Sequence, residues 1–365
     1  MEWVFWISWG FLFFRTGIAT WNVFLPPKLS QRKLDERKLS ILVPARNEVD
    51  ALPNLISQLQ KLTYSDYEVI VLNDNSSDGT EALLMQISQQ WESLTYINGS
   101  SLPEDWLGKN WACHQLSEAA SGHYFLYLDA DVAYIEPDLP QRAIATLELY
   151  ELDLLSIFPT QLMPSLGEKA IVPLMHYLLL SLLPLSWIRL LPFPSMAAAN
   201  GQFMLFNADT YQKYSWHKRV KKEIVEDIAI MQAVKTEKGK GMTLLGENMI
   251  KCRMYEGFVS GIDGFGKNLL AGFGNQLLFL AVYLFLILFS WVILVIEFSS
   301  VQLLGFIAII IWMRICTHFA SKESLWVHVL LHPIHMLSLF VVACNSGYRK
   351  LSGKNIWKGR NIAIK

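Results

Sequence analysis

The stretch YFLYLDADV, residues 124–132, has the pattern of a buried β-strand that runs into two carboxylates. Apolar and aromatic residues fill its first five positions, and Asp129 and Asp131 follow where the strand should end. Two like charges this close to a core are costly unless a positive partner binds them. We therefore expect a cation at the end of this strand.

Strand-like and helix-like segments alternate between about residues 39 and 253. LSILVPARNE (39–48) predicts a first strand, and apolar residues at helical spacing over 52–62 predict a helix after it. YEVIVLND (67–74) and LDLLSIFP (152–159) predict two further strands. This alternation is typical of an α/β fold with a mainly parallel sheet and helices on both faces.

Polar clusters follow three of these strands, at residues 45–48, 73–78 and 129–131. In parallel sheets, ligands bind beyond the carboxyl ends of the strands, so we expect the clusters to meet in one site. The chain has no GxGxxG and no GxxxxGK[ST] after the first strand, which argues against dehydrogenases and ATPases. A phosphate-bearing ligand would then need Mg²⁺ or Mn²⁺, held by Asp129 and Asp131. A solvated or capping acidic pair is the alternative.

The composition favours a membrane protein. The 365 residues suffice for one large domain or two ordinary ones, and 52% of them are hydrophobic while 17% are charged. A net charge of −1 gives no reason to expect a nucleic-acid partner. The cysteines show no CxxC spacing, so we expect reduced thiols: Cys113, Cys252, Cys316 and Cys344.

The N-terminus is predicted to be an uncleaved transmembrane anchor, residues 1–26. The run from Trp3 to Leu25 is long enough to span a bilayer and is interrupted only by Arg15. It lacks the basic start and the small-residue cleavage site of a signal peptide. The basic residues that follow place the next domain in the cytoplasm: Lys28, Arg32, Lys33, Arg37 and Lys38.

Residues 274–345 contain further predicted membrane segments. The run Asn275–Ile296 is the clearest span, Val301–Met313 is short and stops at Arg314, and Leu325–Ala343 carries three histidines on one helical face: His328, His332 and His335. These histidines are expected to pack or to form hydrogen bonds. A basic tail, residues 346–365, should be cytoplasmic, which requires an even number of crossings. We expect two crossings, with one run at the interface.

The apolar run of residues 171–193 is interrupted by Pro173, Pro184 and Arg189. These breaks predict short interfacial helices. A core helix of the α/β domain is the alternative.

Several motifs resemble one enzyme family in the same order along the chain. VPARNE (43–48), LNDNSSDGT (72–80), DAD (129–131), NGQF (200–203) and VED (225–227) resemble the family 2 glycosyltransferases with the Rossmann-like GT-A fold. RMYEGF, LHPI and WKGR, which lie nearer the C-terminus, resemble its membrane-bound branch, including the staphyloxanthin-type carotenoid and the hopanoid-associated glycosyltransferases. The resemblance implies a GT-A domain over residues 39–255, plus transmembrane helices.

The resemblance also implies roles for individual residues. Asp129 and Asp131 match the metal-binding pair, and Asp129 also the nucleotide-sugar site. Asp227 matches the general base of inverting members, with Glu226 as its neighbour in the motif. Apolar residues flank Asp227, so desolvation is expected to raise its pKa. The residues matching the nucleoside site are Asp74 for the base, and Pro44, Ala45 and Glu48 along the base and ribose.

Five further residues are predicted to belong to the site, each with an alternative. Gly201 and Gln202 of NGQF would line the acceptor or donor-sugar pocket, or form a tight turn into a strand. Lys109, on a predicted loop before a helix, would reach a phosphate or the base, or be a surface lysine. Lys358 and Arg360 would bind the donor diphosphate or lipid headgroups, or only flank the membrane.

These observations predict a metal-dependent, inverting glycosyltransferase in the bacterial cell membrane, with a cytoplasmic catalytic domain. It would move one sugar from a nucleotide sugar, a UDP-sugar, to a hydroxyl or carboxyl of a membrane lipid. The resemblance favours carotenoids, related polyisoprenoids or hopanoids. No QxxRW motif follows the predicted base, which indicates a single transfer. The alternatives are a polyprenyl-phosphate sugar synthase and a catalytically inactive membrane scaffold.

Overall fold

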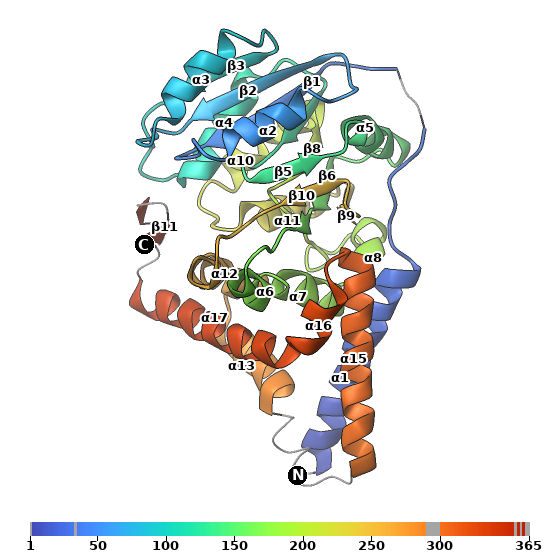
Figure 1. The fold of residues 1–365 in the computed structure, drawn as a ribbon. Coiled ribbons are helices and arrows are strands. Elements are labelled where there is room, and N and C mark those ends of the chain that lie inside the picture. Colours follow the sequence, from blue (N-terminus) through green and yellow to red (C-terminus); the bar gives the residue numbers. More distant parts are fainter. Residues whose placement is uncertain (1, 33–34, 290–299, 354–355, 358–359, 362–365) are drawn as a thin grey trace. The chain divides into compact units, whose positions relative to one another are not determined.

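The computed structural model describes residues 2–32, 35–289, 300–353, 356–357 and 360–361. The chain forms two compact units. The α/β unit comprises Pro27–Thr160 and Leu185–Arg253, and the helical unit comprises Met1–Pro26, Gln161–Pro184 and Met254–Lys365. Figure 1 labels the elements of both units.

The α/β unit contains a seven-stranded sheet in the order β3-β2-β1-β4-β8-β6-β9. The pairs β1–β2, β2–β3, β1–β4 and β6–β9 are parallel, while β8 is antiparallel to β4 and β6. The strands are β1 (Leu39–Ala45), β2 (Tyr67–Asn73), β3 (Leu94–Asn98), β4 (Tyr124–Tyr127), β6 (Leu154–Phe158), β8 (Met204–Asn207) and β9 (Gly241–Leu245). The predicted mainly parallel sheet is confirmed.

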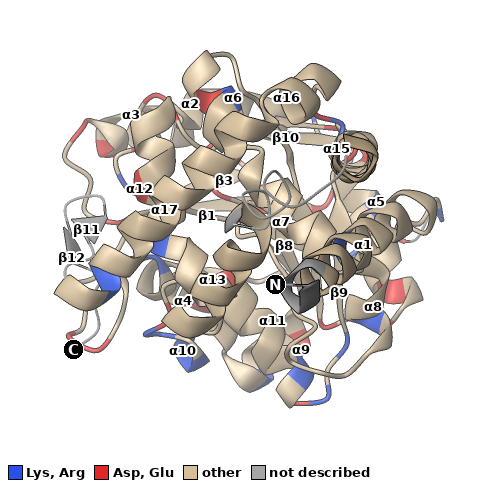
Figure 2. Cartoon of the chain, turned by 90° about the horizontal axis from the view of Figure 1, so that it is seen from below, with Lys and Arg blue, Asp and Glu red and all other residues tan. Residues whose placement is uncertain are grey.

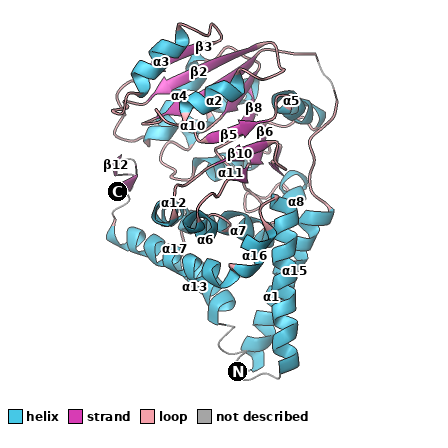
Figure 3. Ribbon diagram, in the orientation of Figure 1, coloured by secondary structure: helices cyan, strands magenta, loops and turns pink. Residues whose placement is uncertain are grey.

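Helices flank these strands, as Figure 3 shows. The apolar positions predicted over 52–62 become α2 (Leu52–Leu59), which buries Leu52, Leu55, Ile56 and Leu59. The other helices of the unit are α3 (Thr80–Ser88), α4 (Gly108–Ala119), α5 (Leu139–Leu149), α8 (Leu185–Leu190), α9 (Ala208–Tyr214), α10 (Trp216–Arg219) and α11 (Glu226–Thr236). β1 is buried along nearly its whole length, as expected for a strand covered on both faces.

Three short strands, β5, β7 and β10, lie outside the seven-stranded sheet. The stretch 124–132 is not one strand: β4 ends at Tyr127, and β5 (Val132–Ile135) begins after the two aspartates. β10 (Ile250–Cys252) pairs antiparallel with β5. β7 (Thr160–Gln161) lies where the chain passes from one unit to the other.

The helical unit contains three long helices and several short ones. Its elements are α1 (Glu2–Phe24), α6 (Leu166–Ile171), α7 (Leu174–Leu182), α12 (Phe258–Gly272), α13 (Leu277–Leu284), the π-helix η1 (Phe285–Phe289), α15 (Ser300–Ser321), α16 (Leu325–Leu330), α17 (His332–Ser352), β11 (Ile356–Trp357) and β12 (Arg360–Asn361). α1 packs along α15, side by side in Figure 1: the rings of Trp9 and Phe306 are 5.5 Å apart, and Trp312 Nε1 donates to Thr20 Oγ1.

Among the described residues, one helix is long and apolar enough to cross a membrane, namely α15. A second span results if α12 and the segment Leu277–Leu288, bent by 106° at their junction, are counted together. The predicted anchor forms α1 but is not among these helices, because Arg15 and its polar and tryptophan residues reduce its mean hydropathy. α15 is longer than the predicted run Val301–Met313, since Arg314 does not end the helix.

The other predicted apolar runs are broken. Leu325–Ala343 is divided between α16 and α17, and Pro333 stands in the first turn of α17. The described part of the run Asn275–Ile296 forms α13 and η1, and residues 290–296 lie outside the described residues. The run 171–193 contains α7 and α8, with breaks at Pro173 and Pro184 as its prolines predict.

Candidate active site

The carboxyl ends of β1, β2 and β4 lie at one edge of the sheet. Ala45 pairs with Asn73, and Leu42 pairs with Tyr127, so the loops after these strands leave in the same direction. The Asp74 amide donates to the Ala45 carbonyl oxygen at 2.8 Å, which joins the first two loops. The three polar clusters predicted from the sequence therefore meet at this edge.

Lys109 lies between two carboxylates at this edge. Its Nζ is 2.8 Å from Asp129 Oδ1 and 2.8 Å from Glu226 Oε1. Although burial lowers the pKa of Lys109, the two carboxylates raise it well above its ordinary value. The prediction that Lys109 stands on a loop was wrong, because α4 already begins at Gly108. A charged lysine in the first turn of α4 thus neutralises part of the acidic cluster, which consists of Asp129, Asp131, Glu226 and Asp227.

Asp131 is the carboxylate of this cluster with an unpaired oxygen. Its Oδ2 accepts a hydrogen bond from Gln202 Nε2 at 3.1 Å, whereas its Oδ1 is buried and has no hydrogen-bond partner among the described residues. Burial, and then the charge of Asp129, raise the pKa of Asp131 to about 7. Gln202 Nε2 also contacts Cys252 Sγ at 2.6 Å, which fixes the amide beside the carboxylate.

The residues at this edge fit a divalent cation. A buried carboxylate oxygen without a partner, next to a second carboxylate, is the kind of ligand that Mg²⁺ and Mn²⁺ bind. Within the described part of the chain, no group of three or more His, Cys, Asp or Glu side chains is placed to hold a metal ion. Asp129 and Asp131 would therefore hold the ion together with oxygens from a bound phosphate group, as is usual for Mg²⁺.

Asp227 is the second residue of α11 and has a different environment. Its Oδ2 accepts a hydrogen bond from the Gly201 amide at 3.0 Å, and its Oδ1 accepts one from the Ile228 amide at 2.7 Å. Burial, and then the charge of Glu226, raise the pKa of Asp227 to about 7. A carboxylate with a pKa near neutrality has the property that a general base requires.

Because Gly201 has no side chain, there is room beside it for the acidic cluster. A Cβ at this position would lie 2.8 Å from Lys109 Nζ and 3.3 Å from Glu226 Oε1. NGQF also leads directly into β8, which begins at Met204. NGQF is thus a turn into a strand, as one of the two predictions has it, and Gly201 and Gln202 also contact the acidic cluster. That these residues line a sugar pocket stays a prediction.

Replacing Gly201 by alanine is expected to displace the Lys109 ammonium from its two carboxylates. Because Lys109 Nζ is the end of a flexible side chain, the protein should still fold, with its melting temperature lowered by a few degrees at most. We expect UDP to bind at least tenfold more weakly in the presence of Mn²⁺, measured by calorimetry. Gly272→Ala, where a Cβ meets nothing within 4 Å, is the matched control. Unchanged UDP binding in Gly201→Ala would contradict the placement of Gly201 in the site.

Lys109→Met is expected to destabilise the protein more at pH 8 than at pH 4. At pH 8 the carboxylates are ionised, and the variant leaves Asp129 and Glu226 without their counter-charge. At pH 4, Asp131 and Asp227 are protonated because their pKa values are about 7, so less repulsion remains. The Lys109 side chain is 38% exposed, so we expect a loss on the order of 1 kcal/mol. Melting temperatures at the two pH values measure it. Lys221→Met, which removes a surface pair with Asp105, is the control.

The predicted nucleoside-binding residues lie at the same edge. Pro44 and Ala45 end β1, and Asp74 directly follows β2. The Glu48 amide donates to Thr80 Oγ1 at 3.0 Å, and its carboxylate is close enough to raise the pKa of Asp131. Their roles toward a nucleotide stay predictions.

Two predicted residues are not brought to this site by the described structure. Lys358 lies outside the described residues, and for Arg360 only the backbone, in β12, is described. One further residue at this edge, Cys252, is not predicted from the sequence, because it belongs to no local motif. Its thiol lies beside Gln202. The contact joins β10 to the NGQF turn across about fifty residues of chain, so no spacing pattern signals it.

Comparison with known proteins agrees with this geometry. Residues 40–158 match the model of the family described as glycosyl transferase family 2. This part of the chain therefore resembles that family. The matched range contains β1, β2 and β4 and the two aspartates Asp129 and Asp131, and it ends with β6. The matched region thus contains the sheet edge with Asp129 and Asp131, while NGQF and Asp227 follow it in the sequence.

Curated relatives extend the similarity beyond this matched region. The chain is 25% identical over 238 residues to the 4,4'-diaponeurosporenoate glycosyltransferase of Staphylococcus haemolyticus, and 27% identical over 253 residues to that of Staphylococcus aureus. The matches cover 65% and 68% of this chain, and 62% and 65% of the relatives, which is less than two thirds of their length.

A solved structure with the same fold covers more of the chain. A mannosyltransferase from Pyrobaculum calidifontis, in complex with GDP-Man and Mn²⁺, matches 94% of this chain and 96% of its own. The TM-score is 0.58 and the sequence identity is 13%. This likeness supports an α/β fold of the GT-A type around the mostly parallel sheet that carries the matched region.

Proposed function

We propose that this protein transfers a single sugar from a UDP-sugar to a membrane lipid, with inversion and with the help of Mg²⁺ or Mn²⁺. The observation that carries this proposal is the unpaired, buried Oδ1 of Asp131 beside Asp129, at the sheet edge where ligands bind. The names of the relatives support a carotenoid or related polyisoprenoid acceptor over a hopanoid. The metal and the nucleotide sugar are supported by the complex of the mannosyltransferase with GDP-Man and Mn²⁺.

Each residue of the site has a distinct task in this proposal. Asp129 and Asp131 would hold the metal ion, which supplies positive charge to the leaving diphosphate. Lys109, released from its carboxylates, adds a second positive charge to the same group. Gly201 and Gln202 border the sugar, and Asp227 accepts the proton of an acceptor hydroxyl or orients an acceptor carboxyl. The residues that bind the nucleoside are Pro44, Ala45, Glu48 and Asp74.

The surface of the helical unit supports the membrane part of the proposal. Many large apolar side chains on its helices are at least 60% exposed, among them Phe14, Leu278, Val301, Leu304, Leu330 and Leu337. In Figure 2, where charged residues are coloured, these helices are tan for most of their length, and blue appears at the end of α17. Exposed apolar surface of this extent is typical of a face that contacts lipid.

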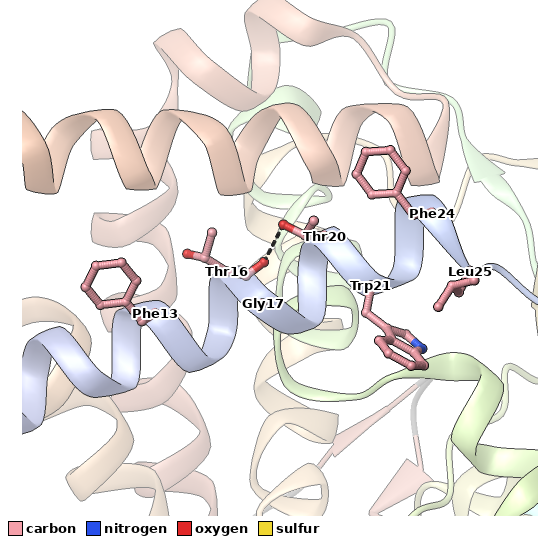
Figure 4. Close-up of a pocket in the computed structure, with 7 residues that line it drawn as sticks. All are labelled: Phe13, Thr16, Gly17, Thr20, Trp21, Phe24 and Leu25. Carbon is pink, nitrogen blue, oxygen red and sulfur yellow. Dashed lines mark hydrogen bonds between the residues drawn. The ribbon is translucent and has the colours of Figure 1, made fainter.

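One face of α1 carries an open apolar groove of about 420 Å³. Figure 4 shows Phe13, Trp21, Phe24 and Leu25 along it, with Thr20 Oγ1 donating to the Thr16 carbonyl oxygen at 2.8 Å. This internal hydrogen bond leaves the groove without a free hydroxyl, as suits contact with lipid chains. Basic residues after α1 and at the end of α17 favour a cytoplasmic position for the α/β unit in a bacterial cell membrane.

The experiment uses membranes that contain the full-length protein, radiolabelled UDP-glucose and, separately, radiolabelled GDP-mannose. We expect label from the UDP-sugar in the extracted lipid, and we expect EDTA to remove the activity. Label in no lipid fraction, with either donor and with added carotenoid acid, carotenoid alcohol or hopanoid, would refute the proposal. Equally tight binding of UDP with Mn²⁺ and with EDTA would refute its metal dependence.

A further inference from the structure

Two arginines are buried in the helical unit on a single tyrosine ring. Arg15 of α1 is 2% exposed and Arg314 of α15 is 0% exposed. The guanidinium carbons lie 4.7 Å and 3.5 Å from the centre of the Tyr177 ring in α7. Burying two like charges is costly unless an anion compensates them. In the sequence, each of these arginines interrupts an apolar run.

A buried carboxylate whose charge acts on Arg314 is already engaged by two histidines. Glu323 is 0% exposed, and its Oε1 and Oε2 lie 2.7 Å from His176 Nδ1 and 2.9 Å from His328 Nε2. Neither Arg15 nor Arg314 forms an ion pair with any carboxylate in the described part of the chain. The positive charge of the pair is therefore not balanced by a direct partner.

The unpaired atoms around the two arginines are hydrogen-bond donors. Arg314 Nε donates to His332 Nδ1 at 2.9 Å, which places the proton of the neutral imidazole on Nε2. His332 Nε2, Arg314 Nη1, Arg314 Nη2 and Arg15 Nε are all buried and have no partner among the described residues. Unsatisfied buried donors are destabilising, and a group with only acceptor oxygens would satisfy them.

We propose that Arg15, Arg314 and His332 bind the carboxylate or phosphate group of an anionic membrane amphiphile. The two free Nη atoms of Arg314 match two oxygens of such a group. The apolar residues packed around the site, which include Leu12, Phe306 and Ile310, favour a ligand with an apolar chain over a free ion. Arg314 stands within α15, which is long and apolar enough to span a membrane, and an ionisable side chain in such a helix usually has a functional partner.

This site deepens the proposed function if the amphiphile is the sugar acceptor, and that identification rests on the proposed function. The binding itself does not depend on it. The chemistry fits an acceptor with an acidic group, or the headgroup of a bulk anionic lipid. The test therefore omits the sugar donor, so that a failure of sugar transfer and a failure of anion binding are separate results.

The test compares retinoic acid with retinol, which share a polyene chain and differ in the acidic group. The full-length protein is placed in phosphatidylcholine nanodiscs, and binding is followed by quenching of tryptophan fluorescence. We expect the acid to bind at least tenfold more tightly than the alcohol, and farnesyl phosphate to displace it better than farnesol does. Equal affinity of the wild-type protein for the acid and the alcohol would overturn the proposal.

Variants of Arg314 test whether the preference for the acid over the alcohol comes from the arginine pair. Arg314→Met should abolish the preference for the acid, and Arg314→Lys, which keeps the charge but loses the two-pronged geometry, should reduce it on the order of tenfold. Because the unliganded site leaves Arg314 unpaired, we expect Arg314→Met to have a melting temperature equal to or above that of the wild type without ligand. A lower melting temperature with an unchanged preference would show a packing role and overturn the proposal.

Three further arms complete the test. Arg189→Met removes an exposed arginine that stacks on Tyr150 in the α/β unit and should leave the preference unchanged. If Arg314→Met does not fold, His332→Phe is the second variant, and it should also weaken the acid selectively. Replacing half of the phosphatidylcholine by phosphatidylglycerol identifies the source. Competition by phosphatidylglycerol indicates a bulk lipid headgroup, and its absence indicates a discrete amphiphile.

Discussion

Replacing Asp131 by asparagine is expected to abolish sugar transfer and to raise the melting temperature at pH 8. The Oδ1 of Asp131 is buried and has no partner among the described residues, and the pKa of about 7 lies well above the ordinary value of an aspartate. A carboxyl whose pKa is raised by folding costs stability as the pH rises from about 4 to about 7. The asparagine removes that cost, so the gain should appear at pH 8 and vanish at pH 4.

The expected loss of activity for Asp131→Asn is on the order of 10²- to 10⁴-fold, because a metal ion supplies several kcal/mol of charge stabilisation. Calorimetric titration with Mn²⁺ in the presence of UDP provides a readout besides activity. Glu148→Gln is the matched control: Glu148 accepts a hydrogen bond from Tyr124, at the opposite end of β4 from the aspartates. Mn²⁺-dependent binding of UDP by Asp131→Asn at wild-type affinity would contradict the assignment.

The sheet edge was predictable because its signals are local. Strands β1, β2 and β4 are short apolar runs bounded by polar turns, and parallel strands necessarily present their carboxyl ends together. The convergence of Asp74 and Asp129 at one edge follows from that rule alone. The strands that sequence reasoning missed have weaker local patterns. β8 has four residues, and its antiparallel position between β4 and β6 depends on strands distant in the chain.

Contacts between distant residues explain the other differences in the active site. Lys109 reaches Glu226, more than one hundred residues away, and Gln202 joins Asp131 to Cys252. No rule based on sequence spacing predicts contacts between residues so far apart in the chain. The acidic motifs predicted the place where a cation would be needed. They did not predict that a lysine of the protein itself lies between two of the carboxylates.

In the helical unit, the sequence contains a sign of the anion site, namely two arginines within apolar runs. Arg15 and Arg314 each break an apolar run, and a charge inside such a run is expensive unless it has a partner or a function. Each arginine, considered by itself, predicts only an interruption of an apolar run. The structure brings both to Tyr177, and the resulting pair of buried charges is what indicates an anion site.

With a hydroxyl acceptor, the rate of sugar transfer is expected to fall as the pH drops below about 7. Asp227 must be ionised to accept the hydroxyl proton, and burial and Glu226 raise its pKa to about 7. The measured kcat/KM should therefore decrease about tenfold for each pH unit below that value. Measurements from pH 5 to pH 8 with a carotenoid alcohol test this slope. A flat profile with the alcohol would contradict the role of Asp227 as base.

Asp227→Asn is expected to lower kcat with the alcohol by on the order of 10²- to 10⁴-fold and to remove the slope. Asp209→Asn is the matched control, since Asp209 is the exposed second residue of α9, whereas Asp227 is the half-buried second residue of α11. A slope that persists in Asp227→Asn would assign the titration to another group.

With a carotenoid acid, the acceptor is already ionised at pH 6 and needs no base. The same variant should then lose less activity, which distinguishes transfer to a hydroxyl from transfer to the acidic group itself.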